Sequence, residues 1–517
     1  MNNQTLDAAS LEILWTRMIG MVDEAAATLV RTSFSHIVRE CHDYAVTLLD
    51  SEGRLLAQST QSIPSFICTL PATARQILER FPRETMRPGD VFITNDPWIG
   101  TGHLPDINIV VPVFHNEMLI AFTASVAHSP DIGGRIRSPG IRELYEEGLR
   151  IPPLRLMHAG EPDHAIFAIL EANVRISEQV LGDLFAQLSA NQMLGSRLKE
   201  LLESTNLDLG AFGREIQSRA EQAMRAAIRE LPDGAHTFRV EVDGFGEPVA
   251  INCRVEIRGD EIEVDYTGSS KQLARAINVV PTYTFAYTCF ALKCVLSPFV
   301  PNNEGSFRPI RVIAPEGSIL NPRFPAPVGA RAMTGHLLPP AVFGALAELV
   351  PERVQAAPGS PLWSCHLTGT NRGKPFACQF FLNGGQGASA NYNGYPAISF
   401  PSNLGNTPVE VLEKQAPVRV LRREVRRGTG GAGAHKGGDG QLLELEILAD
   451  EPVTVSFMAN RLTIPANGLL GGEPGATGAV MLNGTPFDPR EISVIQPRDR
   501  LILATPGGGG FGRTRDS

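Results

Sequence analysis

HLPDINIVVPVFHNEMLIAFTASVAHSPDIGG, residues 103–134, is the stretch from which the fold of the N-terminal half can be predicted. It holds two apolar runs rich in β-branched residues, 107–114 and 118–126, and such runs are typical of strands. If the two runs pair as a hairpin, Asp106 and His128 lie side by side at its open end. The loops at that end would then converge on one point.

The polar residues at this end of the hairpin form a candidate metal site. His103, Asp106 and His128 supply two imidazoles and one carboxylate, a common ligand set for a catalytic divalent ion that leaves positions open for water or substrate. The alternative is that all three are ordinary polar loop residues. Asp131 could orient a ligand histidine or be a turn residue.

A second polar cluster lies at the end of the first predicted helix, in residues 31–44. One interpretation is a solvated helix end with a network of salt bridges. The functional interpretation makes Asp43 a fourth metal ligand, or an acceptor of a hydrogen bond from a ligand histidine.

Hydrophobic periodicity places further elements along the chain. It predicts helices over 6–33, 71–80 and 283–296, and two or three helices within 164–231 that break near Gly195 and near 206–210. It also predicts strands over 46–49, 54–57 and 90–95 and a β-meander over 236–267. The final hundred or so residues are strand-like and punctuated by glycine. The expected class is α+β, with a mixed N-terminal metal-binding half containing long helices and a β-rich C-terminal part.

Three domains are expected from this pattern. They are a metal-binding α+β domain with a helical segment over 1–235, a mixed α/β domain over 236–420 and a β-rich domain over 421–517.

Composition excludes several functional classes. The 46 Lys and Arg against 55 Asp and Glu give a net charge of −9, so nucleic acid is not an expected partner. Residues 1–7 have neither the basic nor the apolar region of an export signal, and no uncharged apolar run approaches the roughly 18 residues of a membrane span. The seven cysteines contain no CxxC pair, which favours reduced thiols and a cytoplasmic location.

Two glycine-rich runs, 428–440 and 507–512, invite a phosphate-binding interpretation. Neither has the GxxxxGK[ST] spacing of a P-loop. The glycines are therefore expected to form tight turns in a β-rich domain, and no nucleotide site is expected in this chain.

Many motifs along the sequence together resemble those of the hydantoinase B/oxoprolinase family, which includes the B-type subunits of ATP-dependent hydantoinases and lactamases and the corresponding subunit of acetone carboxylase. They extend from Arg31-Thr-Ser-Phe-Ser to the final Thr505-Pro-Gly-Gly-Gly-Gly-Phe-Gly512 and include Asp50-Ser-Glu-Gly-Arg54, Asn95-Asp-Pro97, His103-Leu-Pro-Asp106, Asp131-Ile-Gly-Gly134, Pro325-Ala-Pro-Val-Gly-Ala-Arg331, Asn406-Thr-Pro-Val-Glu410 and Gly437-Gly-Asp-Gly440.

The resemblance implies that the chain works with a separate A-type ATPase subunit in a hetero-oligomer. The partner would use ATP to phosphorylate the oxygen of a cyclic amide, and this chain would open the ring by metal-assisted hydrolysis. His103, Asp106 and His128 resemble the family's metal site, for which Mn²⁺, Zn²⁺ or Fe²⁺ is suitable, and Asp43 is expected as the fourth ligand. Asp43 or Asp131 would accept a proton.

Further roles and rival functions follow from the same resemblance. Arg135 or Arg137 could bind the phosphate or a substrate carboxylate, or either could be a solvated loop charge. The chain could instead belong to a ketone carboxylase of the acetone or acetophenone type, or be a scaffold for the ATPase without chemistry of its own.

The sequence departs from the family's usual pattern at three places, which leaves the substrate open. They are Ile63-Pro-Ser-Phe-Ile-Cys68, Asn393-Gly394 and His336-Leu-Leu-Pro-Pro340.

Overall fold

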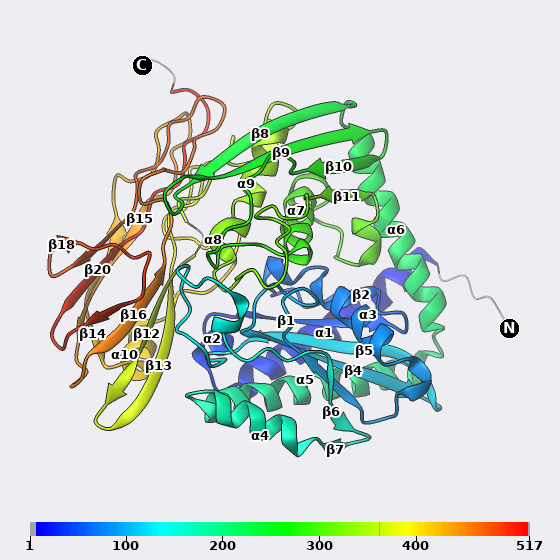
Figure 1. Cartoon of the computed structure of the whole chain (residues 1–517). Coiled ribbons are helices and arrows are strands. Elements are labelled where there is room, and N and C mark those ends of the chain that lie inside the picture. Colours follow the sequence, from blue (N-terminus) through cyan, green and yellow to red (C-terminus); the bar gives the residue numbers. More distant parts are fainter. Residues whose placement is uncertain (1–6, 361, 515–517) are drawn as a thin grey trace.

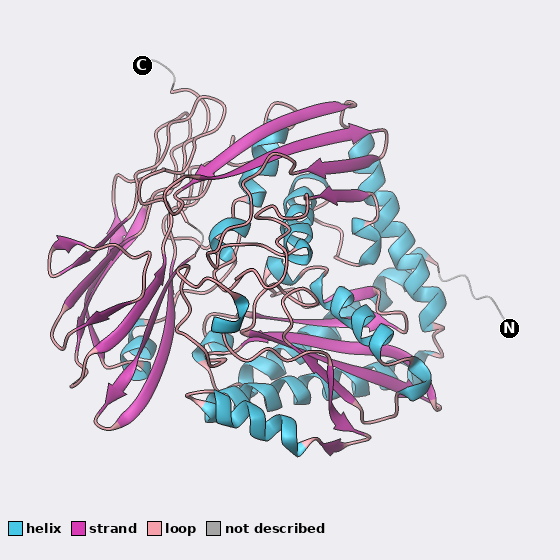
Figure 2. Ribbon diagram, in the orientation of Figure 1, coloured by secondary structure: helices cyan, strands magenta, loops and turns pink. Residues whose placement is uncertain are grey.

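The computed structural model describes residues 7–360 and 362–514, and it confirms the predicted α+β class. Figure 1 shows a seven-stranded sheet with helices on both faces, a four-stranded sheet above it, and a β-rich C-terminal part beside both. Figure 2 shows that helices cluster around the first two sheets, whereas strands and loops dominate the third part. Residues 1–6, on which the expectation about export rests, lie outside the described ranges.

The predicted hairpin is the centre of the seven-stranded sheet. Its strands are β4 (Asp106–His115) and β5 (Met118–His128), which pair antiparallel with Asp106 opposite His128. The full order of the sheet is β2 (Leu55–Gln58), β1 (Tyr44–Asp50), β5, β4, β3 (Val91–Thr94), β6 (Leu154–His158) and β7 (Glu161–Pro162).

Successive side chains of a strand point to opposite faces of its sheet. Every residue of β1 is buried, so both faces of the sheet are covered there. Val46 and Leu48 pack with α1 (Ala8–Thr32), α5 (Ser177–Thr205) and α6 (Leu209–Arg229). On the opposite face lie α3 (Thr69–Arg80) and residues such as Ala45. The short helices α2 (His36–Arg39) and α4 (His164–Asn173) complete this half.

The predicted helix break near Gly195 is wrong, because α5 continues through that residue. A Cβ atom on Gly195 would lie 3.3 Å from Val113 of β4, so this glycine lets the helix pack closely on the sheet. The break near residues 206–210 is confirmed: Asn206 ends α5 with a φ of 52°, and α6 begins at Leu209.

The second sheet follows the predicted meander. Its order is β11 (Ile310–Ile313), β10 (Glu261–Asp265), β9 (Val249–Arg258) and β8 (Gly234–Val242). Between it and the first sheet lie α7 (Pro281–Leu296), α8 (Ala332–Gly335) and α9 (Leu338–Leu346) (Figure 1). The helix predicted over 283–296 is therefore α7, which connects the core of the second sheet with that of the first.

The C-terminal part contains two antiparallel sheets and α10 (Val409–Gln415). One has the order β13 (Lys374–Leu382), β12 (Trp363–Asn371), β16 (Val453–Met458) and β19 (Ser493–Ile495). The other has the order β14 (Val418–Arg426), β15 (Gly440–Ile447), β20 (Arg500–Ala504), β17 (Ala479–Leu482) and β18 (Thr485–Pro486). Because β12 pairs with β16, hydrogen-bonded strands cross the predicted boundary at residue 420. The division into three domains stays a prediction.

The glycine-rich runs are mostly not the tight turns that the sequence predicts. Residues 507–510 form an extended segment that exchanges backbone hydrogen bonds with several earlier segments, including those at Ala357, Gly438 and Glu473. A Cβ atom on Gly507 or Gly509 would lie 1.8 or 2.0 Å from a neighbouring carbonyl oxygen. Glycine is required here because backbones pack directly against one another, and we call this region the glycine bundle.

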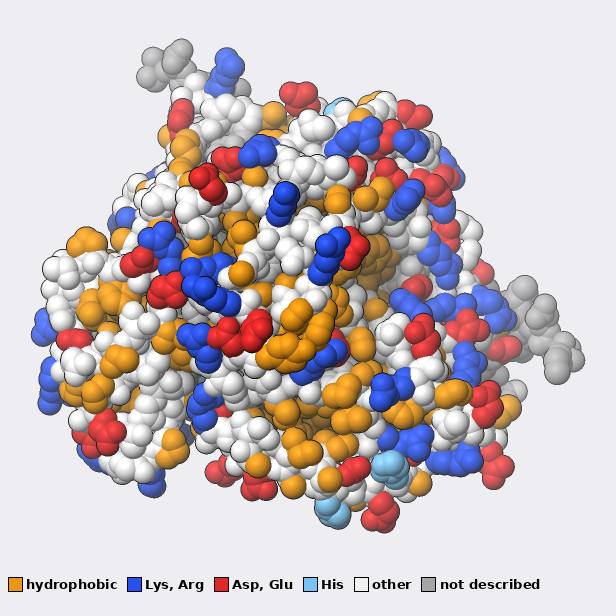
Figure 3. All heavy atoms as spheres, in the orientation of Figure 1, with side chains coloured by type: hydrophobic (Ala, Val, Ile, Leu, Met, Phe, Trp, Pro, Cys, Tyr) orange, Lys and Arg blue, Asp and Glu red, His pale blue; other side chains and the backbone are white. Residues whose placement is uncertain are grey.

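Three general expectations can be compared with the structure. No helix within the described ranges has the length and apolar character needed to cross a membrane. All seven cysteines are free. On the face shown in Figure 3, acidic and basic side chains are interspersed, so no extended basic surface covers this face.

Candidate metal centre

The three predicted ligands meet at the open end of the β4–β5 hairpin. The Asp106 Oδ1 atom lies 2.6 Å from His103 Nε2 and 2.9 Å from His128 Nδ1. The three side chains are buried, and one ligand atom from each lies within 4.8 Å of the others. We call them the His-Asp-His cluster. The pairing of Asp106 with His128 confirms the geometry expected from the hairpin.

A buried arginine fixes the orientation of this cluster. Arg331 Nη2 donates to Asp106 Oδ2 at 2.7 Å, and Arg331 Nη1 lies 2.7 Å from His103 Nδ1. Thr101 also donates to Asp106 Oδ2, at 2.7 Å. Gly102 has a φ of 95°, and its missing side chain makes room for Arg331, because a Cβ atom there would lie 2.9 Å from the arginine Cδ. Asp106 Oδ1 is consequently the oxygen that faces both imidazoles.

The electrostatics favour the protonation states that bind metal. Burial opposes ionisation of Asp106, but its contacts with His103 and Arg331 and a hydrogen bond from His128 hold its pKa well below the usual range. Burial, followed by the charge of Arg331, lowers the pKa of His103 well below its usual value. A carboxylate and a neutral imidazole therefore face the same point.

This donor set fits a divalent metal ion. Two imidazole nitrogens and one carboxylate oxygen suit Mn²⁺, Fe²⁺ or Zn²⁺ and leave part of the coordination sphere for water or substrate. Arg331 and Thr101 occupy only the second oxygen of Asp106 and so do not compete for the first.

Asp43 lies beside the cluster at the start of β1. Its Oδ2 atom is 3.8 Å from His128 Nδ1, and its backbone oxygen accepts a hydrogen bond from the His128 amide. Burial is the main cause that raises the pKa of Asp43 to about 6, with Asp106 raising it further and His128 opposing the change. The side chain is thus placed near the cluster and can exchange a proton near neutral pH.

Asp131 has different partners. Its Oδ1 atom accepts from the Gly133 amide at 3.1 Å and pairs with Arg175 Nη1 at 2.7 Å. Its Oδ2 atom accepts from the Arg175 amide. These hydrogen bonds go to Gly133 and Arg175 and not to the His-Asp-His cluster, and the role of Asp131 stays a prediction.

The two candidate arginines also differ. Arg135 pairs with Glu146, and its side chain is half exposed. Arg137 donates from Nε to the Gly329 oxygen at 2.6 Å, and its Nη1 atom lies 3.5 Å from His128 Nε2. No carboxylate of the described residues forms an ion pair with Arg137. Burial, followed by the charge of Arg331, lowers its pKa to about 10, so it remains a cation at neutral pH.

Two hollows meet at the cluster. We call the first the inner cavity; its lining includes His103, Asp106, His128, Asp43, Tyr283 and Tyr287. The second is the outer pocket, which lies between residues 129–141 and strands β12 and β13. His128 and Arg137 line both, so they form the wall between them.

Several residues at the site could not be identified from sequence. Arg331 lies within a quoted motif, but nothing in its surroundings indicates contact with residue 106. The Oε1 atom of Gln379 on β13 lies 3.3 Å from His128 Nε2. No motif around Gln379 indicates that it belongs to the site. Phe66 and His336, which belong to the segments that depart from the family pattern, line the inner cavity.

Comparison with known proteins extends over the whole chain. The family model described as hydantoinase B/oxoprolinase matches residues 7–514. The caprolactamase subunit beta of Pseudomonas jessenii is 30% identical over 98% of this chain and 91% of its own length. A crystal structure of the ATP-dependent caprolactamase from that organism superimposes with a TM-score of 0.90 at 30% identity, covering 98% of this chain and 92% of that one. A nucleotide-free acetone carboxylase structure has the same fold, with a TM-score of 0.88 at 19% identity over 97% and 75% of the two chains.

Proposed function

The chain belongs to the hydantoinase B/oxoprolinase family, and from that premise we propose that it is the B-type subunit of an ATP-dependent cyclic amidase. The observation that carries the proposal is the convergence of His103, Asp106 and His128 in a buried cavity. A chain with this site has the groups for chemistry of its own, which weighs against a pure scaffold.

Activation of the amide is assigned to a partner ATPase. An amide is a weak electrophile, and the sequence lacks a P-loop, so phosphorylation of the amide oxygen would take place on another subunit. The ATP-dependent caprolactamase supports this division of labour, because its similar chain is named as one subunit of a complex.

The residues of this chain would then complete ring opening. The His-Asp-His cluster, with Asp43 as a further ligand or neighbour, would hold a divalent ion. When bound, such an ion would act as a Lewis acid and would lower the pKa of a coordinated water. Asp43 would accept the proton from the attacking water. The water oxygen adds to the ring carbon, the C–N bond breaks, and the nitrogen leaves as an amine after taking a proton, so the reacting carbon becomes an acyl phosphate. A second water then hydrolyses the acyl phosphate to a carboxylate and releases inorganic phosphate.

Arg137 is the better candidate for binding the phosphate. It faces both the inner cavity and the outer pocket and has no ion pair within the described ranges, whereas Arg135 is already paired at the surface. A planar guanidinium suits a phosphoryl group or a substrate carboxylate. Asp131 remains a weaker candidate for proton transfer, because Arg175 and the backbone already use its carboxylate.

A ketone carboxylase is the second candidate function. Its support is the fold shared with acetone carboxylase, and in that reaction the same site would stabilise an enolate. The two functions differ in their requirement for bicarbonate.

The test is reconstitution with an A-type ATPase subunit, a divalent metal and ATP. We expect ATP-dependent opening of a hydantoin, 5-oxoproline or caprolactam ring, without dependence on bicarbonate, and loss of ring opening in His128→Ala. Product that appears only with bicarbonate would favour the carboxylase. Full activity of His128→Ala in the complex would favour the scaffold.

A further inference from the structure

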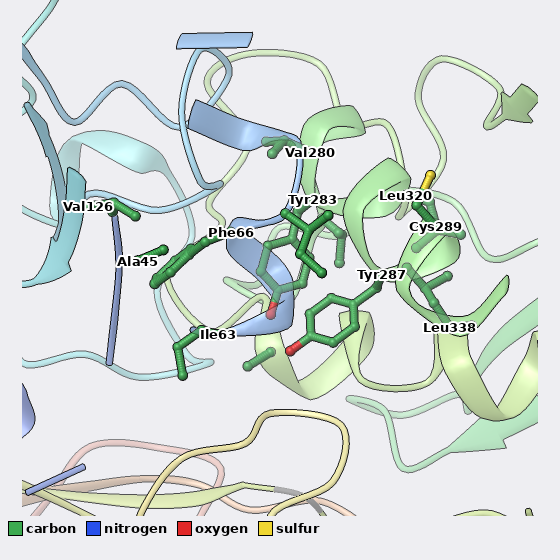
Figure 4. Packing of buried hydrophobic residues seen from close by; sticks show 14 of the residues in the cluster. Ala45, Ile63, Phe66, Val126, Val280, Tyr283, Tyr287, Cys289, Leu320 and Leu338 are labelled. Carbon is green, nitrogen blue, oxygen red and sulfur yellow. The ribbon is translucent and has the colours of Figure 1, made fainter. Parts of the chain in front are cut away.

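Two tyrosines of α7 face the inner cavity. Tyr283 and Tyr287 are four residues apart, so they lie on the same side of the helix, and both line the cavity. Both are buried, with exposed fractions of 2% and 0%. Figure 4 shows their rings beside each other and their hydroxyl oxygens projecting into the same space.

The hydroxyl of Tyr287 has no hydrogen-bond partner within the described ranges. Burial is the main cause that raises the pKa of Tyr287, and the neighbouring Tyr283 raises it further, so the two hydroxyls lie close together. By contrast, the buried hydroxyl of Tyr266, which lies outside α7, is 2.7 Å from the Oγ1 atom of Thr288 on α7. Buried polar groups are normally paired, so an unpartnered hydroxyl that lines a cavity is available to donate to a group bound there.

The tyrosine pair is directly connected to the His-Asp-His cluster. The guanidinium carbon of Arg331 lies 4.3 Å from the centre of the Tyr283 ring, and the same arginine binds Asp106 and His103. On the other side, the His336 ring meets Tyr287 edge to face at 5.3 Å. Burial, followed by the charge of Arg331, lowers the pKa of His336 to about 3, so it is neutral.

The surroundings keep both hydroxyls protonated, so each has a proton to donate. Burial is the main cause that raises the pKa of both tyrosines, so each keeps its proton at neutral pH. Phe66, Phe381 and Leu404 contribute apolar surface to the same cavity. A hydrogen bond to an anion is stronger in such a setting than in water.

We propose that the Tyr283–Tyr287 pair donates hydrogen bonds to an anionic oxygen carried by the reacting carbon of the substrate. This inference rests on the proposed function, and it specifies an oxyanion-binding position in the same inner cavity as the metal ligands. In ring opening, the oxygen of the added water is such an oxygen once it has lost its proton, because it is attached to the tetrahedral carbon whose C–N bond then breaks.

The experiment compares Tyr287→Phe and Tyr283→Phe with Tyr266→Phe in the reconstituted complex. We expect Tyr287→Phe to lower kcat for ring opening by about 100-fold, the usual effect of removing one oxyanion donor, with little change in KM or metal content. Its Tm should stay the same or rise, because the deleted hydroxyl has no protein partner. Tyr283→Phe should also lower kcat. Tyr266→Phe removes a paired hydroxyl and should lower Tm while leaving kcat unchanged.

Opposite results would overturn the proposal. They are a Tyr287→Phe variant whose kcat stays within threefold of wild type, or one whose Tm or metal content falls, since that pattern identifies a structural hydroxyl.

A second measurement separates this inference from the proposed function. The Mn²⁺-loaded complex is titrated with acetate, a small carboxylate probe, and we expect wild type to bind it at least tenfold more tightly than Tyr287→Phe. If no ring opens with any substrate but this difference remains, the proposed function fails and the oxyanion position stands. Equal acetate affinity, or no acetate binding by wild type, overturns the inference even where ring opening is observed.

Discussion

Asp106 and His128 are direct partners across the β4–β5 hairpin, and a 2.9 Å contact joins the Asp106 Oδ1 and His128 Nδ1 atoms. Strand register thereby determines site geometry, since a shift of one residue would turn one side chain to the opposite face of the sheet. The site is built on the centre of a sheet that is buried on both faces, which holds the two groups more rigidly than loops would.

Metal content provides the first prediction. Replacing His103, Asp106 or His128 by alanine removes one of three converging donors, so each variant should lose a divalent ion that wild type retains after dialysis. Elemental analysis measures this directly. His115→Ala, at the far end of the same hairpin, is the matched control and should keep the ion. Retention of the ion by all three variants would contradict the assignment.

Removal of Arg331 should destabilise the protein strongly. Arg331→Met leaves the buried Asp106 carboxylate without its cation, and such a change costs about 3–5 kcal/mol in the free energy of unfolding. Arg323→Met breaks an exposed pair with Glu316 and should cost less than about 1 kcal/mol. Urea denaturation of the two variants compares them, and equal losses would show that the buried pair has no special importance.

Replacing each of the two candidate arginines should affect kcat/KM to a different extent. Arg137→Gln removes a cation with no ion pair within the described ranges, and loss of a charged hydrogen bond of about 1.5–3 kcal/mol corresponds to a roughly 10- to 100-fold lower kcat/KM. Arg135→Gln should leave kcat/KM unchanged, because its Glu146 pair lies at the surface. If Arg135→Gln proves the more damaging change, the phosphate-binding role passes to that residue.

Glu147 should make stability depend on pH. This carboxyl is 6% exposed, its Oε1 atom accepts from the Val328 and Gly329 amides, and burial is the main cause that raises its pKa from 4.5 to about 8. The folded state therefore keeps a proton that the unfolded state loses above pH 4.5. The stability due to this proton is complete below about pH 4.5 and is lost progressively as pH rises to about 8, by up to about 1.4 kcal/mol per pH unit.

Glu147→Gln mimics the protonated form at every pH. Its free energy of unfolding relative to wild type should consequently increase between about pH 5 and 8, as measured by denaturant titration at each pH. A constant difference across that range would mean that Glu147 is ionised in the folded protein.

The glycine bundle should be intolerant of side chains. In Gly509→Ala the new Cβ atom would lie 2.0 Å from the Asn467 carbonyl oxygen, so at least about 3 kcal/mol of stability should be lost. Gly20→Ala places a methyl group in open space on α1 and should be neutral or stabilise by up to about 1 kcal/mol. Thermal unfolding distinguishes the two, and a Gly509→Ala variant with unchanged Tm would contradict the packing.

The sequence predicts those parts of the site that depend on local pattern. The alternation and length of the runs around residues 107–126 indicate a hairpin, and the hairpin places Asp106 beside His128. Arg331 could not be predicted in the same way, because its contact with Asp106 joins residues far apart in the chain and depends on how α8 packs. Gln379 is similar, since only the docking of the C-terminal sheet brings it to His128.

Two errors in the predicted fold come from glycine. At Gly195, helix propensity indicates a break, but close packing on Val113 holds the helix intact. In the runs 428–440 and 507–512, glycine is compatible with either a turn or close backbone packing, and the sequence does not distinguish them. The distinction depends on segments such as that around Asn467, which are distant in the chain.

The glycine bundle also affects the order in which parts of the fold can form while the chain is being translated. Residues 507–510 hydrogen bond with segments around Ala357, Gly438 and Glu473, all of which leave the ribosome earlier. Those segments lack their central partner until nearly the whole of this sequence has been translated. The seven-stranded sheet, whose strands all precede residue 163, has no such requirement and can form while the rest of the chain is still being made. β12 and β13, which line the outer pocket, belong to the part of the chain that is made after this sheet, so the outer pocket is expected to be completed after the sheet.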